Sequence, residues 1–324
     1  MTRRSRPRRS ERRRANATSR DQSAPENPWA SPERVLEFAR EASNIGELVA
    51  HFALASAYVS SNYVEPGESI DDIDSLIGSE DDVPDPLLTA HRLAKFYVIS
   101  AGDALKSCCE LVGREYPMHV GSAALARTTA EHASKAMYLS DPYAGWKVRV
   151  LRAQALFTAA SSEYKSSNET GAREMIGSWE RWRNRTGELF SGVPRQTAKS
   201  NSKLVETYIP HVLAYDELSR PAHGNAVWLT TAVIQEQKGT NYTRCATLRN
   251  MQCAIDAGVA AAVGLCQLWQ LDLDDVVAAA VGESGAITAT WEELASGVDY
   301  VRAGVNDLSN HVELDWTLDP QPRR

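Results

Sequence analysis

The chain of 324 residues has only five cysteines, and no two of them form a Cys-x-x-Cys pair. Structural zinc is therefore not expected, because its ligands come in closely spaced sets. An odd number of cysteines without a secretory signal favours reduced thiols and a cytoplasmic location. We interpret the adjacent Cys108 and Cys109 as small packing residues. Neither a bound metal nor a cofactor is expected.

Long hydrophobic runs and strand signals are also scarce. The most apolar run, from Ala257 to Cys266, is shorter than the roughly 18 residues that a membrane span needs. No period of 20 to 50 residues repeats, which argues against a solenoid. The composition, 43% hydrophobic and 24% charged, is that of a globular chain that can bury a sizeable core. The sequence gives no reason to expect a membrane partner.

Charge is distributed unevenly along the chain. Of 35 basic and 42 acidic residues, nine arginines and one glutamate lie in residues 1–20, which leaves a net charge of −15 on the remainder. An acidic body argues against a broad nucleic-acid groove, although a local patch could still contact RNA. Residues 1–28 lack large apolar residues and are expected to form a disordered basic tail. Residues 316–324 are expected to be frayed.

Apolar residues recur at helical spacing along most of the chain, starting at a capping sequence, Ser31-Pro32-Glu33. The first helix is expected to reach about Tyr63. Further helical patterns cover 87–114, 118–140, 143–166, 171–190, 201–236 with a break at Pro221, 241–271 and 290–312. This pattern predicts an all-α bundle of about seven to nine helices, forming a single domain over residues 29–315.

Residues 64–86 interrupt this pattern. The segment carries nine acids and no base, together with five prolines and glycines. It has no Asp-x-Asp-x-Asp-Gly run that would mark a calcium loop. We predict a solvated acidic loop.

Two polar motifs stand out within the helical pattern. Arg127 precedes Glu131 by four residues, so both lie on one helix face. The guanidinium could be held by Glu131 and directed at an anion. The alternative is an interhelical ion pair that only fixes packing.

The second motif is Tyr215-x3-Ser219-x3-His223-Gly224. Its phenol, hydroxyl and imidazole share one helix surface, but Pro221 either kinks this helix or makes Ser219 the N-cap of a new one. Since polar groups are buried only with partners, we expect Arg127, Glu131, Tyr215 and His223 to meet in one interior cluster. The predicted ligand-binding set is Arg127, Glu131, Tyr215, Ser219 and His223.

The segments RTTAEHASKAMYLSDP (Arg127 to Pro142) and YDELSRPAHGNAVW (Tyr215 to Trp228) resemble two stretches of a group of uncharacterised bacterial helical proteins with HEPN-like character. In that group an R-x3-E helix and a later Y-x3-S-x3-H-G helix recur. The resemblance covers about half of the chain. It implies a helical bundle that can dimerise, and toxin, phage-defence or RNA-processing roles.

HEPN ribonucleases use an R-x4-6-H motif. The catalytic candidates are Arg127 and His132, which match it, and His223 of the second polar motif. The sequence holds two matches, Arg114-x4-His119 and Arg127-x4-His132, where about one is expected by chance. The leading prediction is therefore a non-catalytic or regulatory protein that binds a partner protein or a small anionic ligand. The alternative is a metal-independent ribonuclease, in which an arginine stabilises phosphate charge and a histidine acts as acid or base.

The stretch 171–190 is the one basic segment with aromatics outside the tail. It holds Trp179 and Trp182 together with Arg181, Arg183 and Arg185. Base stacking would use such residues. Tryptophans three residues apart are more typical of a buried stripe beside a solvated face, so we predict core packing for both.

Overall fold

The computed structural model describes residues 29, 31–59, 63–164, 170–209, 212–237, 241–284 and 290–312. The tail expected at residues 1–28 and the frayed end at 316–324 lie outside the described residues. The described part is all-α, and its helices are α1 (Pro32–Tyr58), α2 (Ile70–Ile77), α3 (Pro86–Val112), α4 (His119–Ser140), α5 (Trp146–Tyr164), α6 (Thr170–Thr186), the 3-10 helix η2 (Gly187–Phe190), α7 (Asn201–Tyr208), α8 (Val212–Ala222), α9 (Ala226–Gln237), α10 (Tyr242–Trp269), α11 (Leu273–Ser284) and α12 (Trp291–His311).

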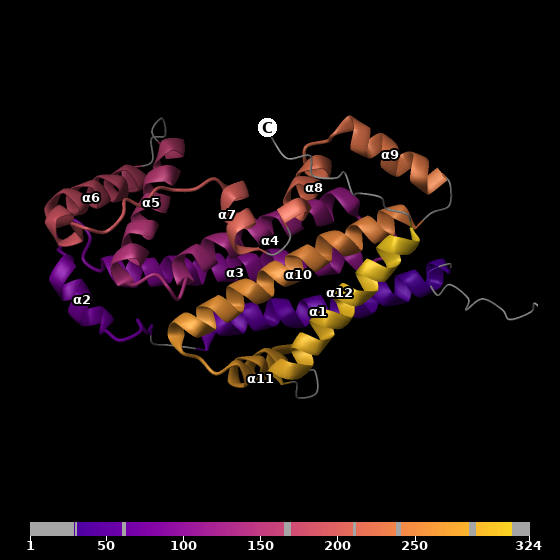
Figure 1. Cartoon of the computed structure of the whole chain (residues 1–324), viewed down its shortest axis with the longest axis horizontal. Helices are drawn as coiled ribbons and strands as arrows, with labels where there is room; N and C mark the ends of the chain where they lie inside the picture. The colour runs from indigo at the N-terminus through magenta and orange to yellow at the C-terminus, as the bar shows by residue number, and fades with distance from the viewer. Residues whose placement is uncertain are drawn as a thin grey trace, which may run out of the picture.

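Four long helices, α1, α3, α4 and α10, run side by side through the centre of the molecule (Figure 1). Nearly all of α10 is buried among the other helices. Within the described residues α10 alone is long and apolar enough to cross a membrane, but 78% of its apolar window is buried, as in the core helix of a bundle. The shorter helices pack around this centre.

Helix α1 begins where the sequence predicts it. The Ser31 hydroxyl accepts a hydrogen bond from the backbone N–H of Arg34 at 3.3 Å, and Pro32 occupies the first turn. Phe38 and Phe52 lie on the buried face. A capping box formed by Thr290 and Glu293 starts α12.

One end of the bundle carries a second apolar cluster, formed by α2, α5, α6 and η2 (Figure 1). Trp179 and Trp182 are both buried there, which confirms the predicted packing role. The Trp182 indole N–H donates to the carbonyl of Ile77 at 2.9 Å and so ties α6 to α2. Helices α7 and α8 lie against α4 instead, while α9 contacts α10 and α8.

The predicted number of helices is too low, because α2 and α11 were not expected. The repeat that forms α2 is Ile70, Ile73, Asp74 and Ile77, all buried. One of the four inward positions of α2 is therefore an acid. This acid interrupts the apolar repeat by which a helix is predicted from sequence. Its other acids, Asp71 and Asp72, lie in the first turn, where they favour the helix.

The predicted helix at 201–236 is three helices, α7, α8 and α9. Of the two alternatives at Pro221, the one in which Ser219 caps a new helix does not apply, because Ser219 lies inside α8 and its hydroxyl donates to the carbonyl of Tyr215 at 2.9 Å. Pro221 is in the last turn of α8, where it cannot donate to the carbonyl of Glu217 four residues earlier, and the helix ends one residue later. The chain then turns at Gly224, whose φ of +66° suits glycine.

The segment 64–86 is not a fully solvated loop. Asp74 is buried and its carboxylate accepts from the first N–H groups of α3, at Leu87 (2.7 Å) and Leu88 (3.0 Å). These are donors that a helix N-terminus leaves unsatisfied. Glu65 is buried as well, at 5% exposure. Two of the nine acids, Glu65 and Asp74, are therefore buried in the fold and are not solvated as expected.

Candidate functional site

The two polar motifs come together on one side of α4. Arg127 and Glu131 project from α4, Tyr215 comes from α8, and His223 lies just beyond the end of α8. We call these four residues the α4–α8 cluster. The predicted meeting of the two motifs is confirmed by direct contacts between residues as far apart as 96 positions.

Glu131 is the centre of the α4–α8 cluster. Its Oε1 accepts from Arg127 Nε at 2.8 Å and from the Tyr215 hydroxyl at 2.9 Å. Its Oε2 accepts from the side-chain amide of Asn201, at the start of α7, at 2.7 Å. Burial raises the pKa of Tyr215, and the hydrogen bond to the Glu131 carboxylate raises it further. The carboxylate thus ties α7 and α8 to α4.

The guanidinium of Arg127 continues outward from Glu131. Its Nη1 lies 2.6 Å from Nε2 of His223, and its carbon lies 5.5 Å from the centre of the Tyr215 ring. Since a guanidinium only donates, Nε2 of His223 is the acceptor in this contact. Tyr215 and Glu131 thereby fix the direction in which Arg127 points.

The α4–α8 cluster is half-buried, and the expectation of an interior cluster is wrong in this respect. The side chains of Arg127 and Glu131 are 26% and 18% exposed, and His223 is exposed. The reason is the position of α8 at the margin of the bundle, where α7 and α8 cover α4 only in part. A partner could reach Arg127 and His223 without any opening of the core.

Two predicted site residues point elsewhere. The Ser219 hydroxyl donates to the carbonyl of Tyr215 on its own helix. His132 packs against α3, with its ring centre 6.0 Å from that of Tyr97. Burial lowers the pKa of His132, and the charge of Lys135 lowers it further. Its Nδ1 has no hydrogen-bond partner among the described residues.

Neither match to the R-x4-6-H motif forms an Arg–His contact in the described residues. Arg127 meets His223 instead of His132, because residues five apart lie about 140° apart around a helix. The exposed Arg114 donates to the carbonyl of Glu110, while His119 stacks on Trp228 with ring centres 4.1 Å apart. The arginine and histidine that do meet come from different motifs.

A second polar network, which the sequence did not reveal, is fully buried. Arg149 Nε donates to Glu65 Oε2 at 2.9 Å, and His91 Nε2 donates to the same oxygen at 3.0 Å. The Trp269 indole N–H donates to His91 Nδ1 at 3.0 Å. An indole N–H cannot accept, so His91 is neutral and protonated on Nε2. We call these four residues the Glu65 network.

The pKa directions in the Glu65 network agree with this geometry. Burial alone would raise the pKa of Glu65, but hydrogen bonds from His91 and Arg149 hold it below its usual value. Burial lowers the pKa of His91, with a further contribution from the charge of Arg149. The polar groups satisfy one another, so the Glu65 network joins α3, α5 and α10 and leaves no group free for a ligand.

His119 gives a pH-dependent prediction. Burial lowers the pKa of His119 from 6.5 to about 4, and both ring nitrogens are buried without a hydrogen-bond partner among the described residues. The unfolded chain therefore takes up this proton first, and stability is lost as pH falls from 6.5 towards 4. Replacing His119 with phenylalanine, which keeps the stack on Trp228, should reduce the loss of unfolding free energy between pH 7 and pH 4 by about 2 kcal/mol.

Urea unfolding at a series of pH values measures this difference. The control is His311→Phe, since His311 is an exposed residue of the last turn of α12. An unchanged pH profile in His119→Phe would show that His119 is solvated in the folded protein.

Comparison with protein-family models, with curated proteins and with solved structures finds no match to this chain.

Proposed function

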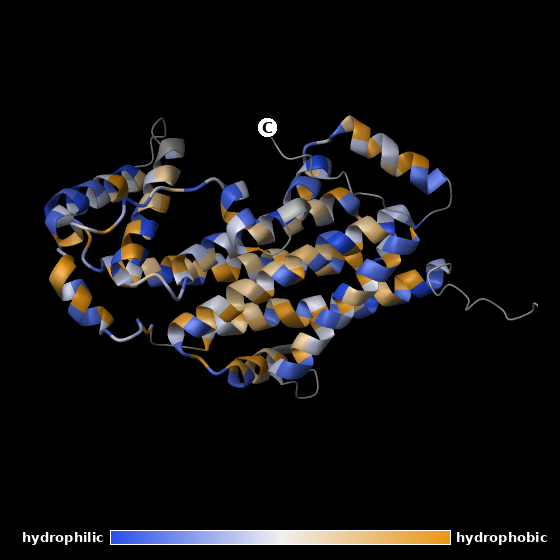
Figure 2. Ribbon diagram, in the orientation of Figure 1, coloured by the Kyte–Doolittle hydropathy of each residue, from blue (hydrophilic) through white to orange (hydrophobic). Residues whose placement is uncertain are grey.

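We propose that the protein is a non-catalytic binding protein, and that its partner is a protein that presents an acidic amphipathic helix. The observation that carries this proposal is the outer face of α9, where Val227, Val233 and Ile234 are 77%, 57% and 45% exposed. Figure 2 shows α9 at the edge of the molecule with much of its ribbon in the hydrophobic colour. Contiguous exposed apolar side chains are characteristic of interaction surfaces.

The exposed residues of α9 share one face of the helix. At about 100° per residue, Val227 and Ile234 lie within about 20° of each other, and Val233 lies about 100° from Ile234 on the same outer side. The buried side chains Trp228 and Ala232 point the opposite way, towards the bundle. An incoming helix could lay an apolar stripe on this outer face.

The α4–α8 cluster supplies a polar edge for the same surface. His223 precedes Val227 by only four residues, and Arg127 reaches His223 from α4. A carboxylate on the partner could accept hydrogen bonds from the guanidinium at this edge. Glu131 and Tyr215 act here as positioning residues, since they hold Arg127 and anchor α8. At this edge the N–H donors of Arg127 suit an accepting carboxylate better than a basic side chain, which has no acceptor.

A small anionic ligand at the same place is less well supported. The charge of Arg127 is already balanced by Glu131 at 2.8 Å, so an isolated anion would gain little from it. A partner helix would gain apolar burial on α9 in addition to the polar contact. The exposed apolar face therefore favours a protein partner.

The proposal predicts which surface a partner helix contacts. A displayed library of helical peptides is selected on the full chain, and recovered peptides should combine an apolar stripe with flanking Asp or Glu. Val233→Asp should weaken their binding about tenfold or more, because it places a charge in the apolar contact. Fluorescence anisotropy with a labelled recovered peptide measures this change.

The matched control is Leu76→Asp, which changes an aliphatic side chain of similar exposure, 62%, on the distant α2. It should leave peptide binding unchanged. Peptides rich in Lys or Arg, or binding that ignores Val233→Asp, would contradict the proposal. A change in solution mass on Val233→Asp would instead identify a second copy of this chain as the occupant.

The competing function is a metal-independent ribonuclease, in line with the HEPN-like resemblance. One observation favours it: Arg127 and His223 lie 2.6 Å apart at a site open to solvent. A ribonuclease would use the guanidinium for phosphate charge and the imidazole as acid or base. Incubation of the protein with total RNA in EDTA decides between the two functions. Cleavage that disappears in both Arg127→Ala and His223→Ala would replace the binding-protein proposal.

A further inference from the structure

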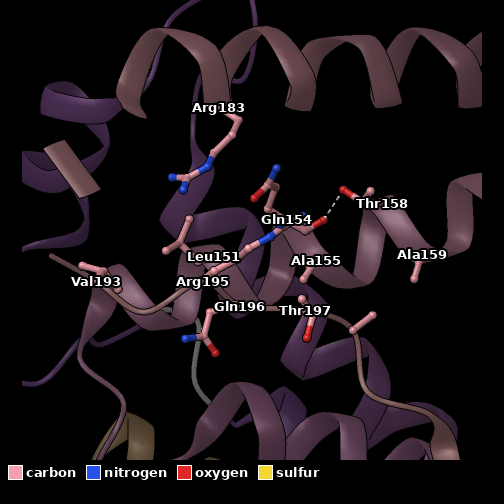
Figure 3. A pocket seen from close by; sticks show the side chains of 11 residues that line it. Leu151, Gln154, Ala155, Thr158, Ala159, Arg183, Val193, Arg195, Gln196 and Thr197 are labelled. Atoms are coloured by element: carbon pink, nitrogen blue, oxygen red, sulfur yellow. Dashed lines mark hydrogen bonds between the residues drawn. The ribbon is translucent and has the colours of Figure 1, made fainter. Parts of the chain in front are cut away.

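A cavity of about 570 Å³ lies between α5, α6 and the segment that follows η2, away from the α4–α8 cluster. Its volume is in the range of sites that hold small molecules, about 300–1,000 Å³. Figure 3 shows Arg183 of α6 and Arg195 of the 193–198 segment extending into the space beside α5, close to Gln154. We call this cavity the α5–α6 pocket.

Arg183 differs from the two other arginines of its helix. Arg185 forms an ion pair with Asp82 at 2.7 Å, and Arg181 donates to the carbonyl of Asp81 at 3.3 Å. These two arginines are four residues apart and share the face that meets the 79–84 segment. Arg183 lies between them in sequence and therefore projects from another face, towards the pocket.

The guanidinium of Arg183 is incompletely satisfied. Its Nη1 is buried and has no hydrogen-bond partner in the described part of the chain. Its guanidinium carbon lies 5.7 Å from the centre of the Phe190 ring. Buried donors in folded proteins normally have partners, so a vacant one directed at a cavity indicates a ligand.

The rest of the pocket lining suits an anion with an apolar body. Arg195 adds a second guanidinium, and neither arginine has an ion-pair partner among the described residues. Among the described residues that line the pocket, none is acidic. Leu151 and Ala155 form an apolar wall, and Gln154 and Gln196 supply amides. The pocket thus holds two positive charges that no described acidic side chain of its lining balances.

We propose that the α5–α6 pocket binds a small phosphate monoester, with the phosphate between Arg183 and Arg195 and the organic part against the α5 wall. A phosphate monoester carries a charge of about −1.5 to −2 at pH 7, which matches two guanidiniums. Its three terminal oxygens can accept from both planar forks at once. A single carboxylate would leave one guanidinium without a partner. This site is separate from the proposed partner surface on α9.

The test is calorimetric titration of the full chain with phenyl phosphate at physiological salt. Arg183→Gln and Arg195→Gln should each weaken binding about tenfold to hundredfold, the usual worth of a hydrogen bond between charged groups. The matched control is Arg173→Gln, which removes the same charge from an exposed position of the same helix. The affinity of the Arg173→Gln variant for phenyl phosphate should equal that of the unaltered chain.

A second pair of measurements tests the organic part of the ligand. Ala159 lines the pocket and is exposed, so Ala159→Phe can fill the space without disturbing the core. It should abolish binding of phenyl phosphate and leave weak binding of inorganic phosphate. Equal binding of the two probes by the unaltered chain would overturn the assignment of a monoester.

The remaining outcomes also decide the proposal. No measurable binding of phenyl phosphate by the unaltered chain, or equal binding by all three arginine variants, overturns it. If Arg183→Gln lowers the melting temperature, the affinity of the Arg195→Gln variant for phenyl phosphate decides the proposal, because Arg195 is exposed. Arg127→Gln should leave phenyl phosphate binding unchanged, so this site and the α9 surface can succeed or fail independently.

Discussion

Replacing Arg149 with alanine is expected to lower the free energy of unfolding by about 3–5 kcal/mol, because it leaves the buried carboxylate of Glu65 without its ion-pair partner. Arg149 is 1% exposed and donates to both oxygens of Glu65, at 2.9 and 3.4 Å. It also donates to the carbonyls of Leu139 and Ala144. The alanine variant removes the Arg149 hydrogen bonds to all these buried acceptors at once, and Glu65 keeps only the bond from His91. Urea unfolding followed by circular dichroism measures the loss.

An exposed ion pair provides the control. Arg34 pairs with Glu37 at 2.5 Å, with side chains 44% and 61% exposed, and Arg34→Ala should cost no more than about 0.5 kcal/mol. The double variant Arg149→Ala/Glu65→Gln should lose clearly less stability than the sum of the two single variants. Strict additivity would show that the two side chains do not interact.

The second large effect is expected at Trp182, where substitution by alanine should also cost about 3–5 kcal/mol. The indole is fully buried, and its ring packs edge-on against Trp179 and Phe190, with ring centres 5.3 and 5.4 Å away. Alanine would leave a large cavity at the junction of α6 and α2. The loss of unfolding free energy is again measured by urea unfolding. The Trp182→Ala variant should also lose phenyl phosphate binding in the adjacent α5–α6 pocket.

Trp182→Phe separates packing from hydrogen bonding. The carbonyl of Ile77 also accepts from Arg185 Nη2 at 2.9 Å, so it keeps a donor when the indole N–H is removed. Phenylalanine should therefore cost much less than alanine, about 1 kcal/mol. If Trp182→Ala were as mild as Trp182→Phe, α6 would not be packed against α2 as described.

Local patterns in the sequence were enough to predict most helices and half of the site. Phe38 and Phe52 recur at helical spacing and are buried as expected. Arg127 and Glu131 form the predicted contact because residues four apart on a helix are neighbours. The motif around Tyr215 indicated a second polar helix face. It meets the polar face of α4 through the hydrogen bond from Tyr215 to Glu131.

The features that the sequence did not reveal depend on contacts between distant segments. Glu65 and Arg149 are 84 positions apart, and nothing in a run of nine acids distinguishes Glu65 from acids that remain in solvent. Asn201 approaches Glu131 only because α7 folds back onto α4. The half-buried state of the α4–α8 cluster likewise follows from where α8 ends against the bundle, which no local spacing encodes.

Amide hydrogen exchange of the full chain, with and without a selected acidic helical peptide, tests the proposed partner surface most directly. Binding across α9 should slow exchange at residues 223–237, where the outer face now lies in solvent. Helix α2, whose Leu76 is comparably exposed, should show no change. Slower exchange at α5 and α6 with no change in α9 would contradict the account and place the partner on another surface.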